Sequence, residues 1–221
     1  MSKRVLMVIT SANEMSDGDA TGLWLEEFAV PWQAFTAAGL AVTVATMRPG
    51  EAPIDPRSTP DDAQRREWAG AIDALAAAVG LEEVWEQKFA ALFIPGGHGT
   101  MFDMPGNPLL AGAIERAYAS GAIVSAVCHG PAAFVGPKKP DGSPVVAGHR
   151  LTCFTNEEER EVGLDAAMPF LLQTRLEELG GKLETAEKFT DFVVEDGQLI
   201  TGQNPPSSEQ TAKRVIAALG E

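Results

Sequence analysis

The chain has 221 residues, and its 17 basic and 31 acidic side chains give a formal net charge of −14 at pH 7. This acidic balance argues against nucleic acid or an anionic membrane surface as a partner, because binding to phosphate requires clustered Lys and Arg. Two cysteines are too few for a disulfide framework, and no apolar run approaches the ~20 residues of a membrane span. We therefore expect a cytoplasmic protein that forms a single domain over residues 1–221.

Short apolar runs alternate with helix-like patterns along most of the chain. In chain order the sequence predicts a strand at 5–10, a helix at 21–38, strands at 41–46 and 89–94, a helix at 108–120, a strand at 122–127, a hairpin of strands 192–195 and 198–201, and a closing helix at 207–219 capped by Ser207. This alternation predicts the α/β class, with a mostly parallel central sheet, helices on both faces and a late β-hairpin. The proline- and charge-rich stretch 48–66 predicts a surface insertion.

The strand predicted at 122–127 leads directly into Cys128-His129-Gly130-Pro131. Small residues two positions either side of the cysteine, Ala126 and Gly130, suit a tight strand-turn-helix bend that exposes only the central side chain, as in a nucleophile elbow. The positive end of a following helix would lower the thiol pKa. The alternative is a cysteine with a packing role, which we expect for Cys153 in its strand-like run without glycine.

Glu27 is the second candidate for chemistry. At 100° per residue it falls within the apolar arc of the first predicted helix, whereas Glu26 projects to the opposite side. A carboxyl group that faces the core must be paired, or protonated with a raised pKa, and such a group suits general acid or base catalysis. The alternative is a glutamate at the edge of the arc that extends into water.

A glycine-rich turn, Pro95-Gly96-Gly97-His98-Gly99-Thr100, follows another predicted strand. Its three glycines would let backbone N–H groups point at a ligand, as an oxyanion hole requires. A plain tight turn, with His98 contacting nothing, is the alternative. The segment matches neither a P-loop nor a dinucleotide fingerprint.

Glu159 is harder to interpret, because Thr155-x-x-Glu158 and Asn156-x-x-Glu159 are both capping-box patterns. The histidines, His98, His129 and His149, lack the helical spacing of a metal motif, and no paired-cysteine motif exists. We therefore expect neither a catalytic metal nor a cofactor.

The Gly97–Thr100 turn, the Ala126–Pro131 elbow and Glu27 within Thr21–Glu27 together make the chain resemble the ThiJ/PfpI superfamily, and within it the heat-shock-protein-31-like branch of glutathione-independent glyoxalases. The likeness runs over nearly the whole chain, including residues 154–159 and 201–205. It implies a flavodoxin-like α/β sandwich that forms a homodimer.

The resemblance also implies roles for particular residues. It places the nucleophile at Cys128, its base at His129, the pocket carboxyl at Glu27 and a third member that orients the histidine at Glu159. The backbone N–H groups of Gly97 and His129 would form the oxyanion hole, and His98 and Gly99 would belong to the same substrate-binding loop. Class I glutamine amidotransferases share the elbow but use a downstream His-x-Glu pair. Only His149-Arg150-Leu151 is available here, which disfavours glutamine hydrolysis.

The main hypothesis is an enzyme that converts small 2-oxoaldehydes such as methylglyoxal to 2-hydroxy acids through a hemithioacetal on Cys128. Three alternatives stay open. The chain could be a holdase chaperone in the stress response, a sensor in which Cys128 is oxidised to sulfinic acid, or a peptidase or amidase that uses a triad through Glu159.

Overall fold

The computed structural model describes residues 3–50 and 52–221, and within them the centre is a seven-stranded sheet of order β3-β2-β1-β4-β5-β9-β8. The strands are β1 (Arg4–Ile9), β2 (Ala41–Thr46), β3 (Val79–Gly80), β4 (Ala91–Ile94), β5 (Ile123–Val127), β8 (Val193–Asp196) and β9 (Leu199–Gly202). Neighbouring strands are parallel except for the antiparallel pair β8 and β9. The predicted flavodoxin-like α/β sandwich with a late hairpin is therefore confirmed.

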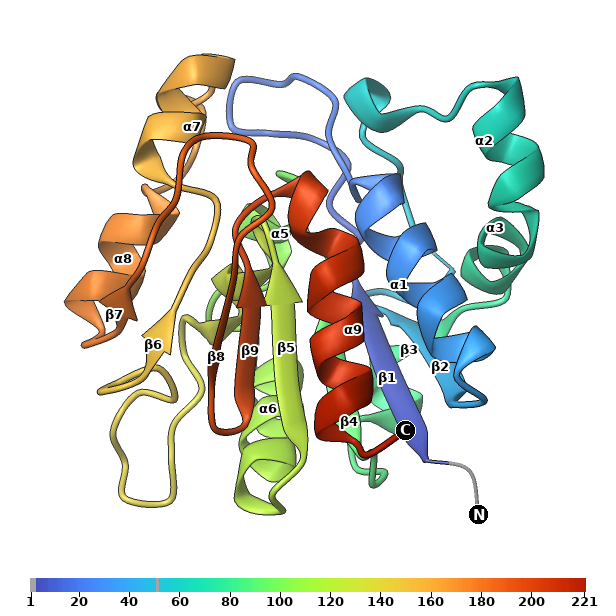
Figure 1. Cartoon of the computed structure of the whole chain (residues 1–221). Helices are drawn as coiled ribbons and strands as arrows, with labels where there is room; N and C mark the ends of the chain where they lie inside the picture. The colour runs from blue at the N-terminus through green and yellow to red at the C-terminus, as the bar shows by residue number, and fades with distance from the viewer. Residues whose placement is uncertain (1–2, 51) are drawn as a thin grey trace.

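Helices cover both faces of the sheet. The helices are α1 (Leu25–Ala37), α2 (Asp62–Glu67), α3 (Ala69–Ala76), α4 (Leu81–Val84), α5 (Thr100–Asp103), α6 (Pro108–Ala119), α7 (Asn156–Val162), α8 (Leu172–Glu178) and α9 (Ser208–Ala218). Figure 1 shows α1 and α9 side by side over one face, with α6 behind the sheet. No helix within 3–50 or 52–221 combines the length and apolarity needed to cross a membrane.

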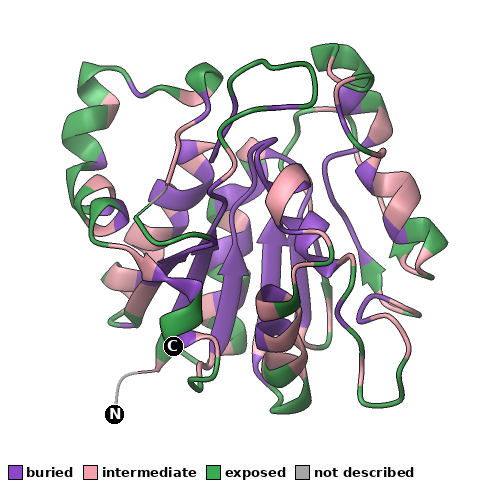
Figure 2. Ribbon diagram, turned by 180° about the vertical axis from the view of Figure 1, so that it is seen from behind, coloured by how far each residue is buried: buried purple, intermediate pink, exposed green. Residues whose placement is uncertain are grey.

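The core forms two layers, one on each side of the sheet. Side chains of a strand point alternately to its two faces, so Val5 and Met7 pack under α1, α3 and α9, while Leu6 and Val8 pack toward α4 and α6. Figure 2 shows the buried strands enclosed by helices that are buried on one side and exposed on the other. The continuous apolar run of β1 follows from this burial on both faces.

The first helix begins four residues later than predicted. Leu23 pairs with Ile54 in an isolated parallel bridge, in which the Leu23 N–H donates to Pro53 O at 2.8 Å and the Asp55 N–H donates to Leu23 O at 2.9 Å. A Cβ at Gly22 would lie 2.3 Å from Pro53 O, so only glycine allows this approach. These contacts with a distant segment keep residues 21–24 extended.

The insertion predicted at 48–66 lies mostly at the surface in its described residues, and it contains a 3-10 turn, η1 (Pro56–Ser58), and most of α2. Two other local predictions were wrong. The strand-like run at 150–154 forms only the two-residue β6 (Arg150–Leu151), which pairs with β7 (Lys182–Leu183) in a separate small sheet. Ser207 does not cap α9, because its hydroxyl accepts from the Phe192 N–H at 3.1 Å and donates to Asn204 at 3.0 Å.

Candidate active site

The predicted nucleophile, glycine turn and pocket carboxyl meet at the carboxyl ends of the central strands. Cys128 follows β5, Gly97 follows β4, and Glu27 lies in the first turn of α1, the helix after β1. Because parallel strands end at the same edge of a sheet, residues far apart in the chain gather there.

Cys128 occupies the tight bend predicted from its neighbours. Its φ of +59° lies in the left-handed region, which non-glycine residues rarely adopt and which is associated with functional sites. A Cβ at Gly130 would lie 2.2 Å from Ile94 O and 3.3 Å from the Ala126 Cβ, so the bend requires glycine there. The helix that we expected after the bend is a five-residue 3-10 helix, η2 (Gly130–Phe134).

The expected lowering of the thiol pKa was wrong. The Cys128 residue is 4% exposed, and burial, followed by the nearby Glu27, raises the pKa of its thiol well above the usual value. A short 3-10 turn does not outweigh that desolvation. The resting form is therefore the thiol, which needs a base to ionise it.

Glu27 is buried, as the helical projection predicted, and Glu26 is only half-buried. The Gly96 N–H donates to Glu27 Oε2 at 2.7 Å, whereas Oε1 has no hydrogen-bond partner among the described residues. Burial raises the pKa of Glu27 to about 8, although the adjacent Cys128 thiol and the Gly96 N–H oppose the shift. Glu27 is therefore protonated at neutral pH, beside the cysteine sulfur.

The raised pKa of Glu27 predicts a pH-dependent stability that the variant Glu27→Gln lacks. The folded state keeps a proton that the unfolded chain releases near pH 4.5, so the wild type loses stability as the pH rises from 4.5 toward 8. Between pH 5.5 and 7.5 its free energy of unfolding should fall by about 3 kcal/mol relative to Glu27→Gln. Urea unfolding at both pH values measures this difference. The exposed variant Glu86→Gln should follow the wild type, and a constant difference between the wild type and Glu27→Gln would contradict the assignment.

Helix α7 positions Glu159 against the elbow. Of the two capping boxes that the sequence offers, the structure forms the one between Thr155 and Glu158, in which the Glu158 N–H donates to Thr155 Oγ1 at 3.1 Å and the Thr155 N–H donates to Glu158 Oε2 at 2.9 Å. Glu159 is thereby free of a capping role. Its Oε2 lies 2.6 Å from His129 Nε2, and His129 Nδ1 lies 3.3 Å from Cys128 Sγ. The structure thus brings Cys128, His129 and Glu159 into one line of hydrogen bonds.

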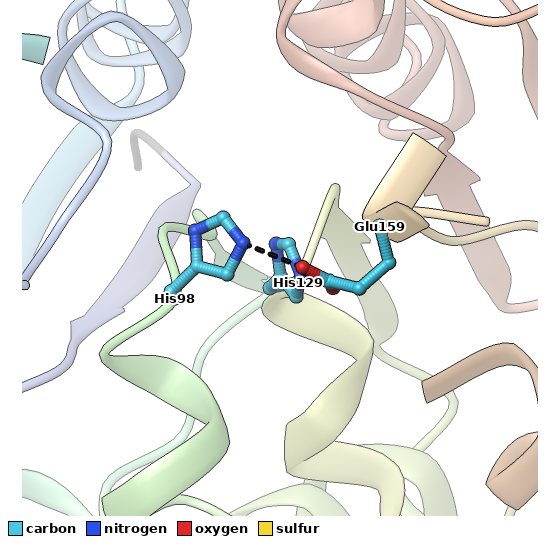
Figure 3. A group of neighbouring side chains, drawn as sticks. All are labelled: His98, His129 and Glu159. Atoms are coloured by element: carbon cyan, nitrogen blue, oxygen red, sulfur yellow. Dashed lines mark hydrogen bonds and ion pairs between the residues drawn. The ribbon is translucent and has the colours of Figure 1, made fainter. Parts of the chain in front are cut away.

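His98 hydrogen-bonds with the same Glu159 carboxylate, a contact that the sequence analysis did not predict. Its Nε2 lies 2.9 Å from Glu159 Oε1, and its Nδ1 lies 3.3 Å from Arg57 Nη2 (Figure 3 shows the two histidines and Glu159). A guanidinium group only donates, so Nδ1 of His98 accepts and Nε2 carries the proton that Glu159 accepts. Burial, followed by the neighbouring His129, lowers the pKa of His98 to about 4. His98 is therefore a neutral donor at neutral pH.

These contacts set the protonation of Glu159. Burial alone would raise its pKa, but His129 and the imidazole donors around it lower that pKa well below the usual range. With Glu159 ionised, Nε2 of His129 donates to it and Nδ1 presents a lone pair to the Cys128 thiol. His129 is therefore oriented to accept the thiol proton, and Glu159 to stabilise the resulting imidazolium.

The glycine turn is closely packed against the segment before α1. Gly97 has a φ of +98°, and a Cβ there would lie 2.3 Å from Gly22 O. Among the described residues no backbone acceptor binds the N–H of Gly97. The N–H of His129 hydrogen-bonds with the Cys128 sulfur. The Gly99 N–H already donates to Gly22 O at 3.3 Å, so it is not the free donor that we expected. The N–H groups that lie at the sulfur are those of Gly97 and His129.

These groups open into a cavity of about 330 Å³. Most of its wall is apolar or aromatic. The lining residues are Trp24, Arg57, Gly97, His98, Cys128, His129, Phe154, Val162, Phe189 and Pro205. Phe154 and Phe189 come from loops, Arg57 and Pro205 from 3-10 turns and Val162 from the end of α7, and no periodicity in the sequence indicated these five as wall residues.

Arg57 reaches the site from the predicted insertion. Its Nε and Nη2 donate to the buried Asp55 carboxylate at 2.9 and 2.6 Å, and Nη2 also lies against His98. Asp55 accepts further from Thr21 Oγ1 at 2.9 Å. The segment around η1 is therefore part of the site.

The structure also groups potential metal ligands. One ligand atom each from His98, His129 and Glu159 lies within 4.8 Å of the others, a donor set of the kind that binds divalent metals. These atoms already hydrogen-bond to one another. The spacing of the histidines in the sequence, which argued against a metal, did not reveal this grouping.

The remaining candidates lie elsewhere. Cys153 is fully buried and its thiol donates to Phe154 O at 3.3 Å, which agrees with the packing role expected for it. His149 hydrogen-bonds with Tyr118 at 2.8 Å and Asp196 at 3.2 Å, and it does not line the cavity.

Comparison with known proteins gives consistent results over nearly the full chain. The model of the DJ-1/PfpI family matches residues 3–218. The glutathione-independent glyoxalase HSP31 of Saccharomyces cerevisiae is 32% identical over an alignment of 233 residues, gaps included, that covers 98% of each protein. The crystal structure of glyoxalase III from Candida albicans has a TM-score of 0.90 at 30% identity and covers 98% of this chain and 97% of that one. The X-ray structure of the Rapid Encystment Protein 24 kDa of Francisella tularensis has a TM-score of 0.92 at 33% identity, and the match covers 98% of this chain and 99% of that one.

Proposed function

Because this chain belongs to the DJ-1/PfpI family, we propose that it is a glutathione-independent glyoxalase that converts 2-oxoaldehydes such as methylglyoxal to 2-hydroxy acids. The observation that carries the proposal is the arrangement around one sulfur atom. Cys128 has a base, His129, at 3.3 Å and a protonated carboxyl, Glu27, beside it. The protein thereby supplies the thiol that glutathione would otherwise provide.

In the proposed reaction, His129 Nδ1 takes the thiol proton and the sulfur adds to the aldehyde carbon. The oxygen of that carbon becomes the hydroxyl of a hemithioacetal after it receives a proton. The N–H groups of Gly97 and His129, which lie next to the sulfur, support the negative charge on that oxygen.

The second stage moves hydrogen between the two oxygenated carbons. Removal of the C1 proton gives an enediolate, and protonation at C2 gives a thioester of the 2-hydroxy acid. His129 and Glu27 are the proton carriers next to the sulfur. Water then cleaves the thioester, which releases the 2-hydroxy acid and restores the thiol.

A lactate assay tests the proposal. The purified protein should consume methylglyoxal in buffer without glutathione and release one lactate for each methylglyoxal, measured by mass spectrometry and by stereospecific D- and L-lactate assays. A protein that consumes no methylglyoxal would rule out the proposed activity. The same Cys-His-Glu line also suits acyl transfer, so a chromogenic ester should be assayed in parallel. An acyl-enzyme burst with the ester in the absence of lactate formation would favour a peptidase or amidase.

A further inference from the structure

A second, smaller cavity lies beside the catalytic one and shares two of its walls. The side cavity has a volume of about 150 Å³, and Trp24 and Arg57 line both cavities. Its remaining walls are polar or aromatic side chains. They are Glu26, Ser58, Thr59, Gln64 and Trp68.

Two of the polar side chains in the side cavity have unused donors. Gln64 Oε1 accepts from the Asp61 N–H at 3.0 Å in the capping box of α2, which leaves the amide N–H groups of Gln64 without an acceptor among the described residues. Arg57 uses Nε and Nη2 for Asp55 and His98, and Nη1 donates to no other described residue. The hydroxyls of Ser58 and Thr59 are already engaged with the backbone.

The side cavity also contains an acceptor. Glu26 is half-buried, and its carboxyl group is hydrogen-bonded by the Trp24 side chain. A carboxyl has two oxygens and can accept more hydrogen bonds than this one contact uses. Donors and a carboxyl acceptor in the lining of one cavity suit a neutral group with hydroxyls, which both donates and accepts. Glu26 and the nearby Asp55 would disfavour an anion.

The catalytic cavity is larger than a three-carbon substrate requires. Its volume of about 330 Å³ lies at the lower end of the range for drug-sized ligands. Its wall near Cys128 is mostly apolar, with Phe154 and Phe189 among the lining side chains. The polar side cavity adjoins this apolar region, because Trp24 and Arg57 line both cavities.

From this arrangement, we propose that the side cavity binds the hydroxylated tail of a 2-oxoaldehyde longer than methylglyoxal. The dicarbonyl end reaches Cys128, a methylene group packs in the apolar region, and tail hydroxyls contact Glu26, Arg57 and Gln64. This inference rests on the proposed glyoxalase function and names the substrate class for that site: sugar-sized 2-oxoaldehydes.

The experiment compares two six-carbon substrates that differ in their hydroxyl groups, 3-deoxyglucosone and 2-oxohexanal, in the wild type and in two variants. Glu26→Gln removes the charged acceptor. Gln64→Glu keeps the capping box, because a carboxylate still accepts from the Asp61 N–H, but it removes the amide donor. Neither residue contacts the Cys128–His129–Glu159 line. Glu86→Gln, on the exposed surface, is the matched control.

Each subsite variant should raise the KM for 3-deoxyglucosone about 10-fold, the size expected for one lost hydrogen bond to a charged or amide group. The kcat of Gln64→Glu should stay within about twofold, and the KM for 2-oxohexanal should change far less in both variants. Glu26→Gln also removes a charge that acts on Glu27, so its KM values carry the test. Equal changes in KM for both substrates would overturn the inference, and so would a wild type that converts methylglyoxal but not 3-deoxyglucosone. A wild type inactive on every 2-oxoaldehyde would overturn the proposed function instead.

Binding to Cys128→Ser protein tests the subsite without chemistry. Calorimetric titration should show tighter binding of 3-deoxyglucosone than of 2-oxohexanal, and adding Glu26→Gln should remove the preference. If both compounds bind equally in the Cys128→Ser protein, the side cavity is not a hydroxyl subsite.

Discussion

Replacement of Cys128 by serine should lower kcat/KM for methylglyoxal at least about 10⁴-fold, as loss of a catalytic nucleophile does in other enzymes. The serine hydroxyl is far less acidic than a thiol, and a buried His129 cannot ionise it to a comparable degree. The buried position of Cys128 makes this dependence on a base stronger, because burial already raises the pKa of the thiol. Lactate release under saturating methylglyoxal measures the effect.

Cys153→Ser is the matched control for this prediction. Cys153 is fully buried outside the cavity, so its replacement should change stability more than activity. Thermal unfolding of both variants separates loss of fold from loss of chemistry. If folded Cys128→Ser protein still released lactate at a rate near that of the wild type, the sulfur would have no role in the reaction.

The second large effect is expected for Glu159→Gln, which should lower kcat about 10³- to 10⁴-fold. Glu159 accepts from His129 on one oxygen and from His98 on the other. A glutamine offers one carbonyl oxygen and one NH₂ group, so one imidazole would meet a donor and would have to change its tautomer. The variant also loses the negative charge that stabilises the His129 imidazolium.

Glu157→Gln, on the same helix and exposed to solvent, should stay within about twofold of the wild type. Lactate release at pH 7 measures the rates of both variants. Wild-type activity in a folded Glu159→Gln protein would show that His129 acts without Glu159.

The patterns that predicted most of the fold depend on neighbours in the chain. The alternating apolar runs indicated the parallel sheet, and the small residues around Cys128 indicated the bend because their steric requirement is local. Glu27 was identifiable because one helical turn determines which face a residue occupies. The cytoplasmic location, the single domain and the homodimer stay predictions, as do the chaperone and sensor alternatives.

The site depends on contacts between segments that are distant in the sequence, and local sequence patterns do not predict such contacts. Two capping boxes were compatible with the sequence of α7, and only docking of that helix on the elbow selected the one that leaves Glu159 beside His129. Arg57 and His98 are separated by 41 positions, and their contact follows from the bridge between Leu23 and Ile54. No pattern within either segment predicts that pairing.

The amino-acid sequence alone determined the sheet, the bend at Cys128 and the inward direction of Glu27, because each follows from sterics and periodicity within a few residues. The tertiary structure decided the protonation of the thiol, the partner of Glu159 and the walls of both cavities. The physical reason is that pKa values and cavity shapes depend on burial and on groups from distant segments, which only the folded chain brings together.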